Sequence, residues 1–384
     1  MSGPLSGVKV VELAGVGPGP FCGMMLADMG ADVLRIDRTE PADIGLPVDP
    51  KLDITARGRR SIALDLKAAQ GVEIAMAIVE KADALIEGFR PGVTERLGLG
   101  PDACHARNPR LIYGRVTGWG QHGPLAQSPG HDINYIAVSG ALHAIGAAGQ
   151  PPVPPLNLVG DYGGGAMYLA FGIVCALVER SRSEKGQVID AAMCDGAASL
   201  MSLFYARMAA GLWQDERGVN ALDGGAPWYG VYETADGKYI AIGAIEARFY
   251  GRLLECMGLD HRSLPPQHDR ARWPELKETL RAAFRQKTRD QWCDTLSDCD
   301  VCFAPVLSLA EAPSHPHNRA RETFMQRRGL VQPAPAPRFS RTLPRVERDP
   351  PRLGEGGAAA LADWGFAPAD IARFRRSGAL MLQD

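Results

Sequence analysis

The sequence predicts an α/β fold: a mainly parallel sheet covered by helices on both faces, followed by a smaller α+β domain. Short apolar runs typical of buried strands alternate with helical patterns through the first 120 residues, and near residue 226 the pattern changes to a hairpin followed by helices. The chain has 384 residues and 46% hydrophobic content, so it is long enough for two domains with sizeable cores.

The N-terminal part reads as successive βαβ units. An apolar run at 8–14 predicts the first strand, a Gly/Pro-rich turn follows it, and residues 20–31 predict a helix before a second strand at 32–37. Further strands are predicted at 61–66, 84–89 and 111–118, with helices at 74–80 and 93–97, mostly helical structure over 131–212, and a strand leading into a helix at 186–193.

The C-terminal part begins with a hairpin signature at 226–244, where two alternating strands flank an Ala-Asp-Gly turn. Helices are predicted after it at 246–258, 274–286, 289–297, 355–364 and from Pro368 onward. The predicted division is a large domain at 1–200, a linker at 201–225, a small α+β domain at 226–326, a Pro- and Arg-rich extended connector at 327–352, and a C-terminal return to the large domain at 353–384.

Composition excludes several function classes. A net charge of −2 gives no electrostatic case for nucleic acid or a membrane surface as the main partner. No basic segment leads into an apolar core at the N-terminus, and no apolar run reaches the roughly 18 residues of a membrane span. We therefore expect a cytoplasmic protein.

The eight cysteines are scattered, mostly inside apolar runs, which is typical of buried free thiols in a reducing compartment. Cys299 and Cys302 form a CxxC pair, but a zinc site needs a second ligand pair and a redox motif needs a thioredoxin-like context. We expect these cysteines to pack, and we expect no metal site.

Two polar residues, His131 and Asp161, stand at the starts of apolar helical runs. Each has an ordinary interpretation, since Asp favours the N-cap position and a histidine near a helix start can be a hydrogen-bonded turn residue. Together they indicate a site, because helix N-termini carry unpaired N–H groups and positive potential that favour developing negative charge. The glycines at 163–165 are expected to let a ligand approach the backbone closely.

Glycines at 15, 17, 19 and 23 after the first strand imitate a dinucleotide fingerprint, but their spacing is not GxGxxG and Pro18 and Pro20 interrupt the loop. A structural turn is the better interpretation. Basic residues gather at the predicted strand ends, where they form either a solvated rim or a site for a phosphate-bearing ligand: Arg35, Arg38, Arg57, Arg59, Arg60 and Arg90.

Several motifs in one order resemble the α-methylacyl-CoA racemases of the family III CoA-transferase superfamily. They include VVELAGVGPGPFCGMMLADMGADVLRIDR, RGRRSIALDLK, GFRPGVTERLGLGP, GHDINYIAVSG, PLNLVGDYGGG and AIGAIEARFY. GEGG at 354–357 departs from the Gly-Glu-His-Thr usual near the end of this family, outside the catalytic segments.

The resemblance implies a Rossmann-like large domain built from both chain ends and an interlocked homodimer. It also implies interconversion of (R)- and (S)-2-methylacyl-CoA thioesters by 1,1-proton transfer through an enolate, without a metal or organic cofactor. His131 and Asp161 are the implied catalytic pair, with Asn157 and Glu246 as orienting residues. The predicted CoA-binding residues are Arg38, Ala63, Leu64, Asp65, Leu66, Gly130, His131, Asp132, Ile133, Asn134 and Tyr135, together with Arg90 from the basic cluster.

Two alternatives remain at this point. A family III CoA-transferase would use Asp161 as a nucleophile, but such enzymes commonly carry a different residue where this chain has His131. A non-catalytic CoA-ester binding protein would need neither proton-transfer group. The motifs fit any acyl chain that presents a 2-methyl α-carbon, whether branched fatty, sterol or aryl-propionyl.

Overall fold

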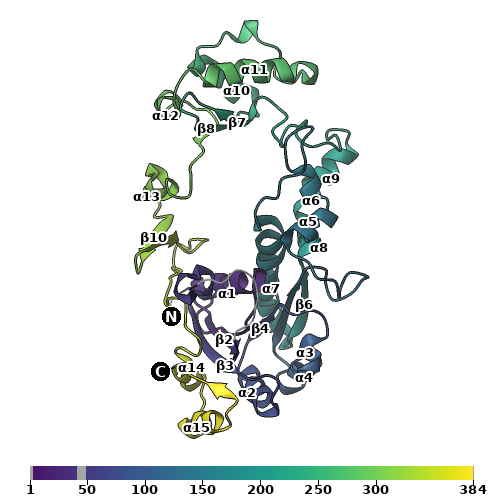
Figure 1. Cartoon of the computed structure of the whole chain (residues 1–384), viewed down its shortest axis with the longest axis vertical. Helices are drawn as coiled ribbons and strands as arrows, with labels where there is room; N and C mark the ends of the chain where they lie inside the picture. Colours follow the sequence, from purple (N-terminus) through teal and green to yellow (C-terminus); the bar gives the residue numbers. More distant parts are fainter. Residues whose placement is uncertain (1–2, 41–48, 384) are drawn as a thin grey trace. The chain divides into compact units, whose positions relative to one another are not determined.

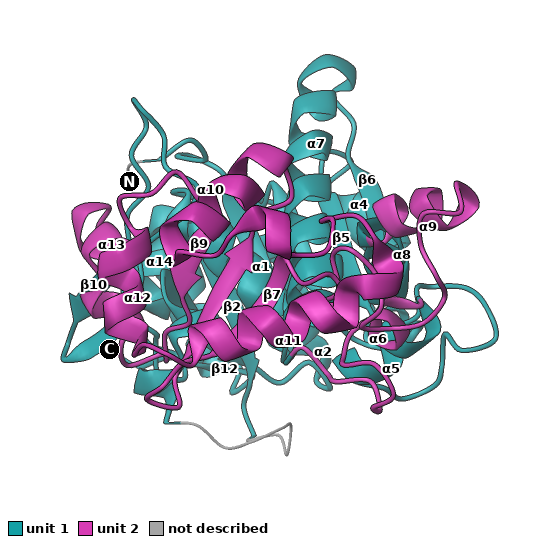
Figure 2. Cartoon of the chain, turned by 90° about the horizontal axis from the view of Figure 1, so that it is seen from above, with its two compact units in different colours: residues 1–139, 156–200, 324–384 teal, residues 140–155, 201–323 magenta. Residues whose placement is uncertain are grey.

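The protein is described here as a computed structural model covering residues 3–40 and 49–383. Its contacts divide the chain into two compact units, coloured separately in Figure 2. Unit 1 combines residues 1–139, 156–200 and 324–384, and unit 2 combines residues 140–155 and 201–323.

Unit 1 is built on a seven-stranded sheet with the order β12-β3-β2-β1-β4-β5-β6. The six strands that follow one another along the chain pair in parallel, and the short C-terminal strand β12 pairs antiparallel with β3. The strands are β1 (Lys9–Leu13), β2 (Asp32–Arg38), β3 (Arg59–Leu64), β4 (Ala84–Glu87), β5 (Ile112–Thr117), β6 (Gln187–Ala192) and β12 (Leu380–Met381), visible in Figure 1. The predicted α/β class is confirmed, including the contribution of both chain ends to one sheet.

Alternating residues of each strand pack against two helical layers, because side chains of a strand point to opposite faces. Val10, Val33 and Ile86 belong to one apolar cluster, with residues of α1 (Pro18–Asp28) and α7 (Met167–Ser183). Their neighbours Val11, Leu34 and Leu85 belong to the other. That second layer is formed by α2 (Ala69–Val79), α4 (Pro101–Arg107), α14 (Gly357–Asp363) and α15 (Pro368–Arg376).

The strand order reverses between β1 and β4, since β2 and β3 lie on one side of β1 and β5 and β6 lie beyond β4. In open α/β sheets, ligands bind outside the carboxyl ends of the strands at such a reversal. The loops after β1, β2, β3 and β4 are therefore where a ligand is expected.

Unit 2 has its own core around a three-stranded antiparallel sheet of β7 (Tyr229–Glu233), β8 (Tyr239–Gly243) and β9 (Phe303–Pro305). Its main helices are α10 (Ala247–Met257), α11 (Trp273–Phe284) and α12 (Arg289–Leu296), whose apolar faces pack with the sheet in one cluster. The predicted hairpin and the three predicted helices are confirmed, whereas the three-residue β9 was not predicted.

The remaining elements are short. They are η1 (Pro50–Leu52), η2 (Ile54–Ala56), α3 (Val93–Arg96), α5 (Asp132–Val138), α6 (Ala141–Ala144), η3 (Leu158–Ala166), α8 (Met193–Leu200), α9 (Ser202–Ala209), η4 (His261–Ser263), η5 (Arg270–Arg272), η6 (Ala312–Ser314), α13 (Pro316–Ala320), β10 (Phe324–Arg327) and β11 (Leu330–Pro333). Helix α9 lies in the segment predicted as a linker. The β10–β11 hairpin spans the predicted boundary between the small domain, which was placed at 226–326, and the extended connector, which was placed at 327–352.

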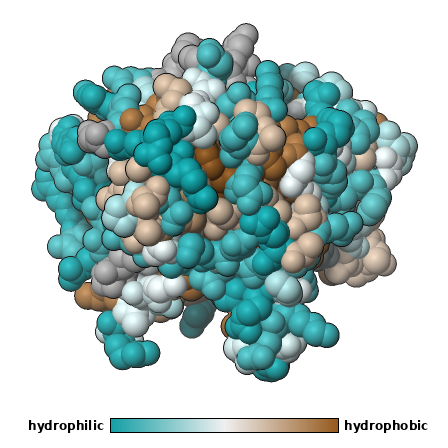
Figure 3. Space-filling view, turned by 90° about the horizontal axis from the view of Figure 1, so that it is seen from below, coloured by the Kyte–Doolittle hydropathy of each residue, from teal (hydrophilic) through white to brown (hydrophobic). Residues whose placement is uncertain are grey.

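The expectation that no apolar run is long enough for a membrane span is wrong by length alone. The glycine-rich segment η3 is itself helical and continues into α7, giving one apolar helix over Leu158–Ser183. One such helix is weak evidence for a membrane, and α7 contributes Leu169, Ala170 and Ile173 to the core of unit 1. On the opposite side, Phe171, Val174 and Val178 remain exposed. Apolar surface also interrupts the hydrophilic face drawn in Figure 3.

The expectation of eight free thiols is also wrong, because Cys256 and Cys299 form a disulfide in unit 2. Cys299 follows the end of α12 and Cys256 lies in α10, so the bridge joins two helices that share the unit 2 core. Pairing of α10 with α12 could not be read from sequence spacing. Cys302 remains a free thiol.

Candidate active site

His131 is the N-cap of α5, with extended backbone and an exposed side chain. Its backbone N–H donates to Oδ1 of Asn134 at 3.0 Å, and the Tyr135 hydroxyl donates to the carbonyl oxygen of Gly130. Gly130 and His131 are thereby hydrogen-bonded to side chains from the first turn of α5. The backbone that carries the exposed imidazole is therefore fixed by the contacts of Asn134 and Tyr135.

The buried ring of Tyr135 packs against this turn. A Cβ atom at Gly118 would lie 1.9 Å from its ring, and the ring of Trp119 meets it edge-on at a centroid distance of 4.9 Å. Burial raises the pKa of Tyr135 to about 12, with Asp161 adding to the rise and Arg90 opposing it. The predicted role of Tyr135 as a CoA ligand therefore leaves its hydroxyl out, because that group is engaged with the turn.

Asp161 does not occupy the N-cap position expected from the sequence. It lies within the wide helix η3, whose N-cap is Asn157. The Asn157 side-chain amide donates to Oδ2 of Asp161 at 3.2 Å, in agreement with the predicted orienting role. A Cβ atom at Gly17 would lie 3.1 Å from the same oxygen, so the loop before α1 approaches the carboxyl closely.

The electrostatic setting of Asp161 favours its protonated form. Burial raises its pKa, the amide of Asn157 lowers it, Asp132 raises it and His131 lowers it. The two residues belong to segments joined by a hydrogen bond, because Asp132, next to His131, accepts the backbone N–H of Asp161 at 2.9 Å. Two groups that can each carry a proton therefore stand at the starts of adjacent helices.

The glycines at 163–165 have a different role from the one expected. A Cβ atom at Gly164 would lie 2.6 Å from the backbone nitrogen of Ala197, and one at Gly165 would lie 2.7 Å from the Met193 side chain. Their missing side chains let η3 pack directly against α8. A Cβ atom at Gly196 in α8 would in turn lie 1.9 Å from the Gly164 carbonyl oxygen, so the contact is between backbones.

A cavity of about 570 Å³ opens at the carboxyl ends of β1 to β4, where the strand order reverses. Its lining contains Arg38, Leu64, Asp65 and Leu66 from the predicted CoA-binding set. Ala63 is fully buried within β3 and is not among the residues that line the cavity. The rest of the lining is Leu13, Ala14, Ile36, Asp37, Thr39, Glu40, Lys67, Phe89, Val93 and Leu97.

Phe89 is a cavity residue that the sequence did not single out. The Arg38 guanidinium lies over its ring at 5.8 Å from the centroid, which fits a cation–π contact. Its position gave a signal in the sequence, because Phe89 is the last residue of the strand predicted at 84–89, beside the strand-order reversal. Arg90 is exposed in the same loop.

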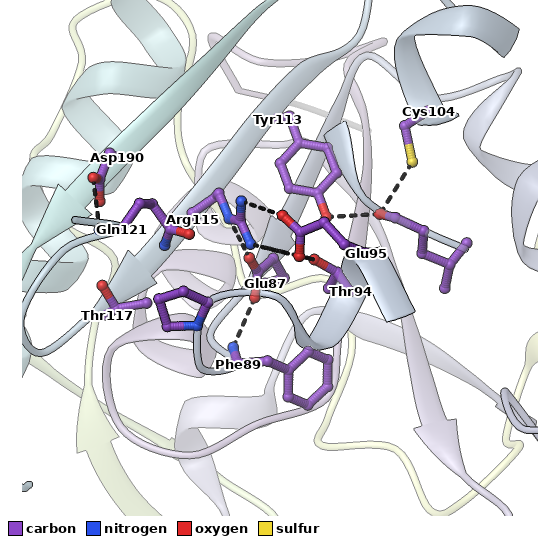
Figure 4. A network of polar contacts seen from close by, with 12 residues as sticks. Glu87, Phe89, Thr94, Glu95, Cys104, Tyr113, Arg115, Thr117, Gln121 and Asp190 are labelled. Atoms are coloured by element: carbon purple, nitrogen blue, oxygen red, sulfur yellow. Dashed lines mark hydrogen bonds and ion pairs between the residues drawn. The ribbon is translucent and has the colours of Figure 1, made fainter. Parts of the chain in front are cut away.

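A buried ionic network holds this loop, and Figure 4 shows how its members converge. Oε2 of Glu87 accepts the Phe89 backbone N–H at 2.7 Å, and its Oε1 accepts Nε of Arg115 at 2.7 Å. Arg115 also donates to Glu95 of α3 at 2.8 Å. Burial raises the pKa of Glu87, and the Phe89 N–H and Arg115 oppose that rise. The loop that places Phe89 on the cavity wall is thus bonded to β4, and through Arg115 to β5 and α3.

Glu246 belongs to unit 2, where it is the exposed N-cap of α10 and makes no side-chain capping bond. Its proposed role of orienting His131 stays a prediction. Within residues 3–40 and 49–383, no cluster of three or more His, Cys, Asp or Glu side chains has the arrangement of a metal site.

Comparison with known proteins gives matches over nearly the whole chain. A family model described as CoA-transferase family III matches residues 5–356. An α-methylacyl-CoA racemase of Mus musculus is 48% identical over 370 residues, covering 96% of this chain and 95% of that protein. A racemase of the same name from Homo sapiens is 43% identical over 372 residues, again covering 96% and 95%. The crystal structure of a CAIB/BAIF family protein from Brucella suis matches with a TM-score of 0.82 and 28% identity, covering 95% of this chain and all of that one.

Proposed function

The chain belongs to CoA-transferase family III, and from this we propose that it is an α-methylacyl-CoA racemase. The reaction is the interconversion of (R)- and (S)-2-methylacyl-CoA thioesters. The observation that carries the proposal is the link between the starts of α5 and η3: Asp132, the residue after His131, accepts the backbone N–H of Asp161 at 2.9 Å, which brings the segments of the two proton-transfer groups together.

The proposed mechanism is a 1,1-proton transfer. One group removes the proton α to the thioester and the other returns a proton to the opposite face, and their roles exchange with direction. The enolate formed between the two steps carries charge on its oxygen, which backbone N–H groups at the start of α5 are placed to stabilise. Both proton carriers come from the chain itself, so the proposal includes no metal or organic cofactor.

We assign the CoA moiety to the cavity at the carboxyl ends of β1 to β4. CoA is polyanionic, and Arg38 and Lys67 supply positive charge to the cavity wall. Arg90 is exposed in the adjoining loop, directly after the cavity residue Phe89. Binding at a strand-order reversal is the arrangement expected for an open α/β sheet.

Replacing Phe89 with Ala should weaken binding of the substrate while leaving the chemical step intact. The change removes the ring under the Arg38 guanidinium, and a cation–π contact is worth about 0.5–1 kcal/mol, or roughly a two- to fivefold change in affinity. KM for the acyl-CoA is expected to rise by that factor with kcat nearly unchanged. Phe339→Ala, at a partly exposed position away from the cavity lining, is the matched control, and an equal rise in KM there would contradict this role for Phe89.

The nearest alternative is CoA transfer with Asp161 as nucleophile, forming an anhydride with the acyl group. Proximity of a histidine to that carboxyl favours proton transfer instead, because a two-base reaction requires both groups and the nucleophilic route requires only Asp161. The high identity to proteins named as racemases supports the same choice.

We also propose that the chain acts as a homodimer in the cytoplasm. Exposed apolar side chains follow one side of α7 at Met167, Phe171, Val174 and Val178, a spacing of three to four residues that aligns them along the helix. A continuous apolar stripe of this kind marks a contact with another protein surface. A second copy of the chain packed on this stripe would shield it from water. This would explain why so apolar a helix is exposed along one side in the single chain.

The deciding experiment incubates the purified protein with one enantiomer of a 2-methylacyl-CoA in deuterated water, without any acceptor acid. Racemisation with deuterium at the α-carbon is expected. Retained configuration without deuterium across several acyl chains would reject the racemase proposal, and a screen of acceptor acids would then test CoA transfer through Asp161. Tight binding of acyl-CoA with neither reaction would indicate a binding protein.

A further inference from the structure

The side chain of Asp132 connects the two elements that carry His131 and Asp161. It is 6% exposed and lies in the first turn of α5, directly after His131. Its Oδ1 accepts the backbone N–H of Gly160 at 2.7 Å and that of Asp161 at 2.9 Å. A single buried carboxylate therefore ties the backbone of Asp161 to the helix that begins at His131.

The packing around this link leaves no room for an alternative arrangement. A Cβ atom at Gly160 would lie 2.5 Å from Oδ1 of Asp132, so the close approach of η3 to α5 requires glycine there. Oδ2 of Asp132 is buried and has no hydrogen-bond partner among the described residues. The two carboxylate oxygens thus differ: Oδ1 accepts both backbone hydrogen bonds, and Oδ2 accepts none from the described residues.

That charge acts on Asp161. Burial raises the pKa of Asp161 first, and the like charge of Asp132 raises it further, against the lowering effects of Asn157 and His131. The elements packed on η3 carry further titratable groups. They include Cys194 and Asp195 in α8, Tyr168 and Cys175 in α7, Arg115 in β5, Asp190 in β6 and Tyr135 in α5.

We propose that Asp132 is a positioning residue for the proton transfer, which sets the backbone of Asp161 against the helix start of His131. The role rests on the proposed racemase function. A reaction that moves a proton from one face of a carbon to the other needs both groups at a fixed separation, and a misplacement of about 1 Å can cost roughly 10²-fold in rate. The Asp132 carboxylate supplies that constraint through its bonds to the backbone N–H groups of Gly160 and Asp161.

Two substitutions separate the link from the charge. Asp132→Asn keeps an oxygen for the two backbone N–H groups and removes the negative charge, and its amide nitrogen replaces an oxygen that has no partner to lose. Asp132→Ala removes both. Asp83→Asn is the control for loss of a carboxylate elsewhere: Asp83 accepts the Lys9 backbone N–H at 2.8 Å and pairs with Arg180 at 2.7 Å, at the amino end of the sheet.

The measurement is kcat and KM for racemisation, with α-deuterium exchange, as a function of pH. Asp132→Ala should lower kcat by roughly 10²-fold with KM little changed. Asp132→Asn should retain most of kcat at its optimum but move the limb of the pH profile that belongs to Asp161 to lower pH, because removal of a like charge lowers the pKa of that carboxyl. A merely structural residue would not move this limb.

Each outcome decides the role. Wild-type kcat in Asp132→Ala, or a loss expressed only in KM, would overturn it while leaving the racemase function standing. If Asp132→Ala does not fold, Asp132→Asn decides: it keeps the oxygen that accepts the two N–H groups, so a fall in kcat of about 10²-fold at its pH optimum would reject the role. Absence of exchange in the wild-type protein would instead overturn the proposed function on which this role rests.

Discussion

Replacing His131 with Ala is expected to lower kcat for racemisation by about 10²–10⁴-fold, the range typical of a positioned general acid or base. The imidazole is exposed at the N-cap of α5, while the backbone around it is held by Asn134 and Tyr135. Removing the ring should therefore remove a proton carrier and leave the turn in place. KM for acyl-CoA should change little, because the proposed CoA cavity lies at the ends of β1 to β4 and its lining does not include His131.

The measurement is the rate of stereochemical change at the α-carbon, with acyl-CoA affinity determined separately. His317→Ala provides the control, since that histidine is also exposed but belongs to α13. Full racemase activity in His131→Ala would remove His131 from the mechanism. A loss of activity accompanied by an equal loss of affinity would assign His131 to binding instead.

The sheet of unit 1 was predictable because its strands are short apolar runs separated by turn signals. β1, β2 and β5 lie within one or two residues of their predicted bounds. The strands that escaped prediction are short, with two to four residues: β9, β10, β11 and β12. Segments that short carry no clear periodicity. β9 and β12 become strands because β8 and β3 offer them a pairing edge, and β10 and β11 because they pair with each other.

Glycines account for the main local misinterpretation. GDYGGG after Asn157 reads as a break before a helix, because glycine weakens helices in isolation. Here the missing side chains admit α8, and the contact holds the segment as the helix η3. The partner of Gly164 is Gly196, 32 residues further along the chain, so the compensation could not be seen locally. The N-cap interpretation of Asp161 failed for the same reason.

The residue types of the candidate site could be predicted from the sequence. The hydrogen bonds that connect its elements could be predicted only in part. His131, Asp161 and Arg38 were identifiable because they follow turns at predicted element starts or ends. The bond from Asp132 to the backbone of Asp161 spans 29 residues and depends on the packing of α5 against η3. The resemblance placed Asp132 among CoA-binding residues, and only the structure shows what its carboxylate contacts.

Replacing Asp161 with Asn should have an effect as large as the loss of His131, with a different stereochemical pattern. The amide has nearly the shape of the carboxyl and can still accept a bond from Asn157, but it cannot take the α-proton at neutral pH. Racemisation should fall by about 10²–10⁴-fold. His131 remains able to remove the proton from the enantiomer that faces it and to return a deuteron to the same face. That enantiomer should therefore exchange with retained configuration, while the other should not exchange.

Opposite exchange patterns in the two variants would show that the two proton carriers act on opposite faces of the α-carbon. His131→Ala should permit exchange only of the enantiomer that Asp161→Asn leaves inert, because each variant retains one of the two proton carriers. The measurement is deuterium content and configuration for each pure enantiomer, with Asp83→Asn as the control for loss of a carboxylate elsewhere. Exchange of the same enantiomer in both variants would place the two groups on one face and reject the two-base mechanism. Formation of an acyl adduct that depends on Asp161, together with undiminished transfer in His131→Ala, would favour the transferase.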